Sequence, residues 1–153
     1  MPLKSSIWQE WGDYMPIEFE GLEGILKRFN DMENAEGVKQ GLEKGCLAVE
    51  RSAKQHAPKG NGALARSITS KVEDFTGVVS TPLFYAPYVE YGTGLFATGE
   101  SGGRKDVPWV YRDDKTGDFI TTYGQHPQPY MRPALDENRD NIIEYIREGL
   151  IDD

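Results

Sequence analysis

The sequence contains very little cysteine and histidine. Its 153 residues include one cysteine, Cys46, and two histidines, His56 and His126. A single cysteine excludes a disulfide within the chain and fits a reducing compartment. Two histidines far apart in the sequence argue against a structural zinc site. The sequence therefore predicts no bound metal, no cofactor, and a chain that stays in the cytoplasm until it joins a larger assembly.

Long hydrophobic runs and common catalytic motifs are also absent. No stretch approaches the roughly 18 apolar residues of a membrane helix, and the first residues lack the apolar run of a signal peptide. No G-x-S-x-G, phosphate-binding loop or Cys-x-x-Cys pattern occurs. Residues 92–97 formally fit the dinucleotide pattern G-x-G-x-x-A, but the glycine-rich residues after them do not predict the helix that should follow. We interpret Gly92 and Gly94 as positions of positive φ instead.

The chain is acidic, with 17 basic and 25 acidic residues and a formal charge of −8. This charge argues against general binding to nucleic acids or anionic membranes. The charge is uneven, because residues 38–73 carry a net positive charge and both ends, residues 1–37 and 134–153, carry a net negative one. The basic middle could dock on an acidic partner or pair with acids of its own fold.

Apolar residues spaced three and four apart predict three helices. The clearest helix spans residues 38–57, with Cys46 as a small core residue, and Pro58 ends it. A shorter helix is expected at residues 22–32. A final helix is expected from Pro133, with its apolar stripe continuing to Leu150.

Shorter segments with alternating or β-branched residues predict strands. They lie at residues 17–19, 71–73 and 78–81, with a turn at Thr76-Gly77 between the latter two. Residues 85–91 are read as an aromatic strand that is an edge strand or is bulged at Pro87. Residues 109–112 and 119–123 predict a hairpin. The expected fold is α+β, with a small, mainly antiparallel sheet packed against two longer helices and a protruding loop or hairpin.

The chain is long enough for one domain. We expect an N-terminal extension at residues 1–15 and a single domain at residues 16–153 that carries an insert at residues 95–126. Such a long connection is usually functional or disordered. The expected hairpin has more aromatic surface than a solvated loop needs. We therefore expect the insert to project, to be mobile in the free protein, and to become ordered against a neighbouring subunit or a neck partner. The alternative is that it adds strands to the core sheet.

No residue is predicted to be catalytic, to bind a cofactor or to hold a metal. Glu90 could serve as a general acid, but such a residue more often points outward or forms an ion pair with a base such as Arg66 or Arg132. Arg132 itself could pair with an acid or clamp a neighbouring subunit. The candidate interface or structural residues are Glu90, Tyr91, Gly92, Trp109, Tyr111, Phe119, Tyr130 and Arg132.

Three segments, taken in order, resemble the phage head–tail joining, or tail-completion, family. The first has Ala57-Pro58 followed by Gly62, Leu64 and Ser67-Ile68. The second has Tyr85-Ala86 and then Glu90-Tyr91-Gly92-Thr93. The third has Gln128-Pro129-Tyr130 and then Pro133-Ala134-Leu135. The resemblance covers roughly residues 17–150.

The resemblance implies a non-enzymatic minor structural protein of tailed bacteriophages and prophages. It would sit at the virion neck, where the head joins the tail, often as a ring, with six copies as one expected number. Its partners would be copies of itself, head connector or adaptor proteins, and a tail tube or tail terminator protein, without specific nucleic-acid binding or a membrane. Two alternatives remain: a small enzyme that uses Glu90 with His56 or His126, and a nucleic-acid-binding regulator that uses the basic helix.

Overall fold

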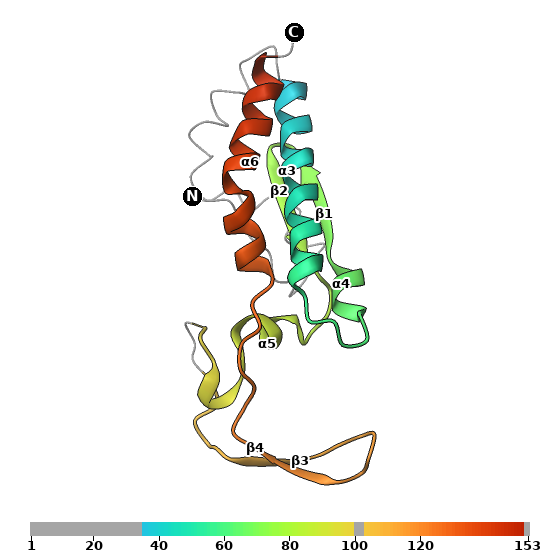
Figure 1. Ribbon diagram of the computed structural model, residues 1–153, viewed down its shortest axis with the longest axis vertical. Helices are drawn as coiled ribbons and strands as arrows, with labels where there is room; N and C mark the ends of the chain where they lie inside the picture. Colours follow the sequence, from blue (N-terminus) through green and yellow to red (C-terminus); the bar gives the residue numbers. More distant parts are fainter. Residues whose placement is uncertain (1–34, 100–102, 152–153) are drawn as a thin grey trace.

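Two long antiparallel helices form the body of the protein. The computed structural model describes residues 35–99 and 103–151. Helix α3 (Ala35–His56) and helix α6 (Met131–Ile151) lie side by side, with the short elements at one end and along α3 (Figure 1). Together with two small antiparallel sheets, they confirm the expected α+β fold. The extension at residues 1–15, the strand at 17–19 and the helix at 22–32 lie outside the described residues.

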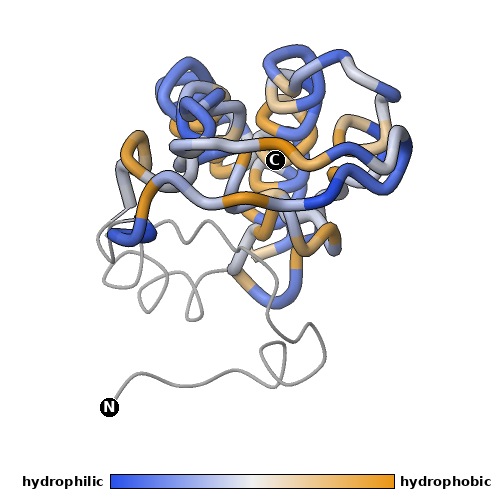
Figure 2. The backbone as a smooth tube through the Cα atoms, turned by 90° about the horizontal axis from the view of Figure 1, so that it is seen from below, coloured by the Kyte–Doolittle hydropathy of each residue, from blue (hydrophilic) through white to orange (hydrophobic). Residues whose placement is uncertain are grey.

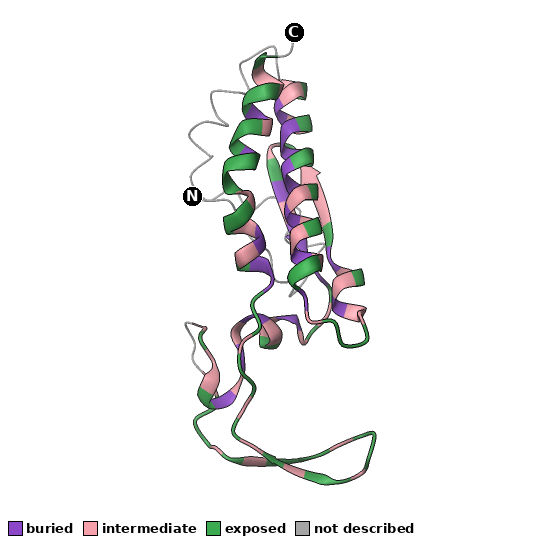
Figure 3. Ribbon diagram, in the orientation of Figure 1, coloured by how far each residue is buried: buried purple, intermediate pink, exposed green. Residues whose placement is uncertain are grey.

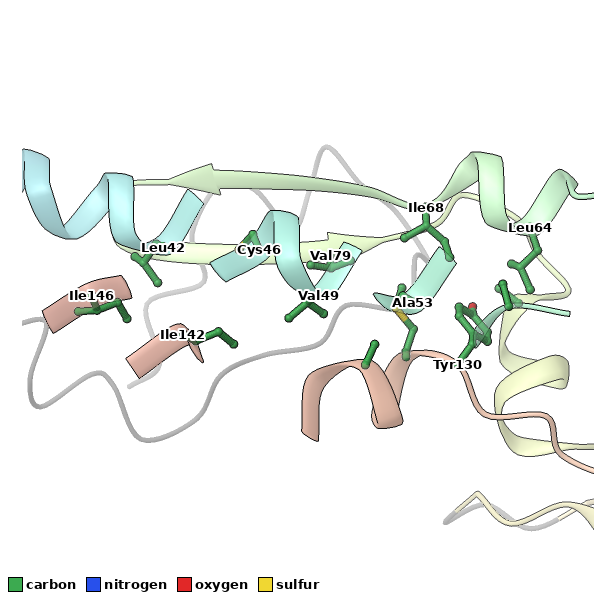
Figure 4. Packing of buried hydrophobic residues seen from close by; sticks show 14 of the residues in the cluster. Leu42, Cys46, Val49, Ala53, Leu64, Ile68, Val79, Tyr130, Ile142 and Ile146 are labelled. Atoms are coloured by element: carbon green, nitrogen blue, oxygen red, sulfur yellow. The ribbon is translucent and has the colours of Figure 1, made fainter. Parts of the chain in front are cut away.

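The apolar stripe of α3 forms the centre of the core, as its spacing predicts. The buried hydrophobic residues of the core are Val38, Leu42, Cys46, Val49, Ala53, Ala57, Leu64, Ile68, Val79, Ala86, Tyr130, Met131, Ala134, Ile142 and Ile146. Figure 4 shows those of α3 pointing between α6 and the strands. Burial raises the pKa of the Cys46 thiol to about 11, with Glu43 and Glu50 adding to the effect. Cys46 is therefore a core residue and an unreactive thiol.

Glycines allow α3 and α6 to approach closely. Gly37, Gly41 and Gly45 are one turn apart on α3, and each faces backbone or side-chain atoms of α6. A Cβ atom on Gly41 would lie 2.5 Å from the Tyr145 carbonyl oxygen and 2.8 Å from the Ile146 Cα. The backbones are thus too close for any side chain at this position.

We expect Gly41→Ala to destabilise the fold by about 1–2 kcal/mol. Alanine gains roughly 1 kcal/mol over glycine in helix propensity. Overpacking costs about 1–3 kcal/mol, and the backbone atoms at this contact cannot rotate away, so the cost here should be about 2–3 kcal/mol. Denaturant unfolding measures the difference. Gly60→Ala is the control, since nothing lies within 4 Å of its Cβ position. A Gly41→Ala chain as stable as the wild type would show that the helices separate at no cost.

The first sheet is the hairpin of β1 (Thr69–Glu73) and β2 (Thr76–Ser80), which lies along α3. Its strands pair from Thr69 with Ser80 to Glu73 with Thr76. The turn is therefore at Asp74-Phe75, and the expected turn at Thr76-Gly77 is wrong. Asp74 adopts a φ of 53°, which aspartate tolerates better than most residues. Gly77 is a strand residue whose absent Cβ leaves room for the Cys46 Sγ.

Residues 85–91 do not form the expected strand. Ala86–Tyr91 is helix α5, and Pro87 occupies its first turn. Proline suits that position because its fixed φ is helical and its missing N–H would have no partner there. The Gly92 N–H closes the helix by donating to the Tyr88 carbonyl. The strand expected from the aromatic pattern is therefore wrong. The buried residues Ala86 and Glu90 are four apart, which is the spacing of one helix face.

The insert carries the second sheet, formed by β3 (Trp109–Arg112) and β4 (Phe119–Thr122), and this confirms the expected hairpin. The two hairpins form separate sheets rather than one. The insert hairpin hangs below the helices, beyond α5 (Figure 1). The alternative in which it adds strands to the core sheet is not what the structure shows. A short helix, α4 (Ala63–Ser67), precedes β1.

Candidate functional site

The junction of α5 and α6 places Glu90 at the start of α6. Both Glu90 carboxylate oxygens accept hydrogen bonds from backbone N–H groups at the start of this helix: Tyr130 at 2.7 Å, Met131 at 2.9 Å and Arg132 at 3.0 Å. Glu90 is 4% exposed. The first N–H groups of a helix lack partners within the helix and lie at its positive end, so they suit a buried carboxylate. Glu90 is thus an N-terminal cap supplied from another helix.

The ion pairs expected for Glu90 are not formed. Arg132 meets Glu90 through its backbone N–H, and its guanidinium lies 5.9 Å from the Tyr91 ring centroid, at the range of a cation–π contact. Arg66 instead donates to the Asn61 carbonyl oxygen. α6 begins at Met131, two residues before the expected start at Pro133. Arg132 is exposed, so it is free to meet a partner surface.

Tyr130 is completely buried beside the cap. Burial, with the nearby Glu90 carboxylate, raises the pKa of its hydroxyl well above its usual range. Among the described residues, no atom pairs with this hydroxyl. A buried polar group without a hydrogen-bond partner destabilises the fold, because it has lost the hydrogen bonds that water makes with it in the unfolded chain.

We expect Tyr130→Phe to stabilise the protein by about 1 kcal/mol, because it removes an unpaired buried hydroxyl and keeps the ring. Thermal unfolding measures the change. Tyr88→Phe, at an exposed position on α5, is the control and should be neutral. A less stable Tyr130→Phe chain would show that the hydroxyl has a partner in solution.

His56 lies at the end of α3, and its Nε2 is 2.8 Å from the Glu137 Oε1 on α6. The Ser52 hydroxyl donates to the other oxygen of the same carboxylate at 2.8 Å. These bonds hold the pKa of Glu137 below its usual range. In a Ser-His-Asp triad the histidine lies between serine and carboxylate, whereas here the carboxylate lies between the other two. The cluster joins two helices and lacks the geometry of a nucleophile with its base.

His126 stacks on Phe96, with ring centroids 3.8 Å apart. Among the described residues, no hydrogen bond joins Glu90 to His126 or His56. The carboxylate of Glu90 is occupied by backbone donors. The residues named for the enzyme alternative are therefore not gathered into one bonded cluster.

The insert is closed at its base by a hydrogen-bonded stem. The Thr93 N–H donates to the Gln125 carbonyl at 2.9 Å, and the Leu95 N–H donates to the Tyr123 carbonyl at 3.0 Å. The Gln125 N–H donates in turn to the Thr93 hydroxyl at 2.9 Å. The stem thus holds the two ends of the insert together.

Glycines with positive φ make this stem possible. Gly92 has a φ of 75° and Gly94 a φ of 59°, as expected from the sequence. A Cβ on Gly92 would lie 2.7 Å from the Gln125 carbonyl oxygen, and a Cβ on Gly94 would collide with the Tyr123 carbonyl. In the described part of this segment, Gly94 begins the short 3-10 helix η1 (Gly94–Phe96) and no further helix follows before Gly99. The two glycines therefore provide the backbone conformations and the close approach that the stem requires.

The hairpin exposes aromatic and apolar side chains. Phe119 is 77% exposed and Tyr111 is 45% exposed, while Trp109 is partly covered by the Arg104 guanidinium, 5.2 Å from its ring. None of residues 103–124 is buried (Figure 3). Seen from this end of the molecule, the insert shows several hydrophobic stretches (Figure 2). The hairpin therefore offers an exposed apolar surface to a partner.

Sequence reasoning missed two features. The paired backbone bonds of the stem join residues far apart in the chain, and the sequence showed only the glycines at their ends, such as Gly92 and Gly94. The close contact of α3 with α6 did have a signal, since Gly37, Gly41 and Gly45 recur every fourth residue inside a helical pattern.

The described residues contain no cluster of three or more histidine, cysteine or acidic side chains that could hold a metal ion. In the same part of the chain, no helix is long and apolar enough to cross a membrane.

Residues 23–92 match the model of the HK97-gp10-like family, described as "Bacteriophage HK97-gp10, putative tail-component". The match covers somewhat less than half of the chain and ends at Gly92, where the stem of the insert begins. It confirms the resemblance to a phage head–tail joining family and supports a structural role in a phage particle. No curated protein and no solved structure matches the chain significantly.

Proposed function

We propose that this chain is a non-enzymatic structural protein of a phage or prophage, and that it joins the head connector to the tail at the virion neck as a ring. The match of residues 23–92 to a phage tail-component family carries the proposal. Its partners would be further copies of the chain, the head connector or adaptor proteins, and the tail tube or tail terminator protein. It would reside in the host cytoplasm during assembly.

The geometry supports the proposal, because the hydrophobic core and the exposed insert are separate parts of the molecule. The core lies between α3, α6 and the first sheet, and the insert projects from a closed stem. A ring needs two different contact patches on each subunit, because its contacts are head to tail. The exposed aromatic residues of the insert, including Tyr111 and Phe119, suit one of these patches.

Removal of the insert tests this function. We expect replacement of residues 98–122 by a short Gly-Ser linker to leave the thermal unfolding temperature nearly unchanged, because residues 103–122 include no buried side chain and the stem holds the ends together. In the phage that encodes the chain, heads and tails should then accumulate unjoined. The unmodified chain supplied in trans is the control. Infectious particles formed with the shortened chain alone would contradict the proposal.

A further inference from the structure

The insert hairpin has two open edges. Among the described residues, β3 and β4 pair only with each other. Each strand therefore presents a row of backbone N–H and C=O groups without strand partners. An isolated two-stranded hairpin is marginally stable in water, and a further strand or a packed face is needed to hold it. The hairpin can therefore accept a further strand at either edge.

Neither face of the hairpin is fully covered. Successive side chains of a strand point to opposite faces, so Val110 and Tyr111 lie on different faces, and they are 60% and 45% exposed. In the register of the pair, Tyr111 is opposite Ile120 and Arg112 is opposite Phe119. A strand added at an edge would extend both faces and cover part of this apolar surface.

The two halves of the hairpin carry opposite charge. Residues 103–112, the basic arm, hold three basic side chains and one acidic one, and residues 113–124, the acidic arm, hold three acidic side chains and one basic one. At the turn, Arg112 ends β3 and Asp118 precedes β4. Both are exposed, and no ion pair of the described residues joins them. One edge of the hairpin therefore complements the other edge of a second copy.

We propose that the free edge of β3 in one copy pairs with the free edge of β4 in a second copy, with Arg112 of the basic arm beside Asp118 of the acidic arm. The proposal rests on the proposed ring. A rotation about the ring axis gives every β3 the same direction, and β4 runs antiparallel to β3. The contact between copies is therefore antiparallel too, and a full turn closes a barrel with two strands from each copy. Closure removes every open edge.

Charge reversal in the full chain tests this contact. Arg112→Glu places two acids at the contact, and Asp118→Lys places two bases there. Sedimentation over a concentration series should show that the wild-type chain associates, and that each variant lowers the association constant at low salt by about tenfold or more. Arg139→Glu on α6, outside the insert, is the control. Thermal unfolding of each variant checks that the fold is kept.

Variants that restore opposite charges at the contact show whether the hairpin pairs with a second copy of the chain. The chain that carries both reversals again has opposite charges at the contact, so it should associate like the wild type. An equimolar mixture of the two single variants should associate as well, because each supplies the charge that the other lacks. A wild-type chain that stays monomeric throughout, or single variants that both the mixture and the double reversal fail to rescue, would overturn the proposal.

Two outcomes separate this contact from the function it rests on. Rings that form equally well with either reversal would overturn the strand pairing and leave the neck function standing. Single variants that associate normally but block the joining of heads to tails would show that the hairpin edge binds another virion protein, which also overturns the pairing between copies.

Discussion

Glu90→Gln is expected to lower the free energy of unfolding by about 2–4 kcal/mol. The carboxylate accepts three backbone hydrogen bonds, from Tyr130, Met131 and Arg132, while almost fully buried. Hydrogen bonds to a charged group contribute roughly 1.5–3 kcal/mol, and the positive end of a helix adds up to about 2 kcal/mol. Glutamine keeps one acceptor oxygen, but its NH₂ group would face an N–H donor. At least one buried N–H would then lose its partner.

Chemical or thermal denaturation measures this loss, which corresponds to a fall of roughly 5–15 °C in Tm for a chain of this size. Glu137→Gln is the matched control, since that carboxylate is also hydrogen-bonded but is exposed on α6. Its effect should be much smaller than that of Glu90→Gln, because solvent screens the bonds of an exposed carboxylate. Equal losses for the two variants would mean that burial and the start of the helix give Glu90 no special role.

Gly92→Val is expected to destabilise the protein by on the order of 3 kcal/mol. Gly92 has a φ of 75° and a ψ of −177°, a region that is essentially restricted to glycine, and forcing another residue there costs about 1–3 kcal/mol. The valine Cβ would also lie 2.7 Å from the Gln125 carbonyl oxygen and 2.8 Å from the Pro127 nitrogen. This second conflict acts on the stem, so the insert should loosen as well.

Two measurements separate these effects. Thermal unfolding gives the loss of stability, with Gly60→Val as the control, because nothing lies near its Cβ position. Limited proteolysis reports on the insert, and the variant should be cut faster within residues 95–126 than the wild type. A variant with unchanged unfolding and unchanged cleavage would show that the backbone at Gly92 is not restrictive.

The sequence by itself determined the elements whose signals are local. The apolar stripe of α3 and the proline after it defined that helix, and Cys46 lay in the core as its position on the stripe predicted. The insert hairpin was found from two β-branched and aromatic runs around a polar loop. The order of the three quoted segments predicted a phage structural family, which the match at residues 23–92 confirms.

The tertiary structure alone decided two kinds of feature. In the first, local sequence signals conflict, and in the second, the sequence carries no local signal. Aromatic residues around Pro87 are compatible with a strand or with the first turn of a helix, and the burial of Ala86 and Glu90 on one face of α5 favours the helix. Glu90 could not be recognised as a cap, because its three donors lie some forty positions away. A residue's type sets the bonds it can make, but folding decides which groups from distant segments come within reach.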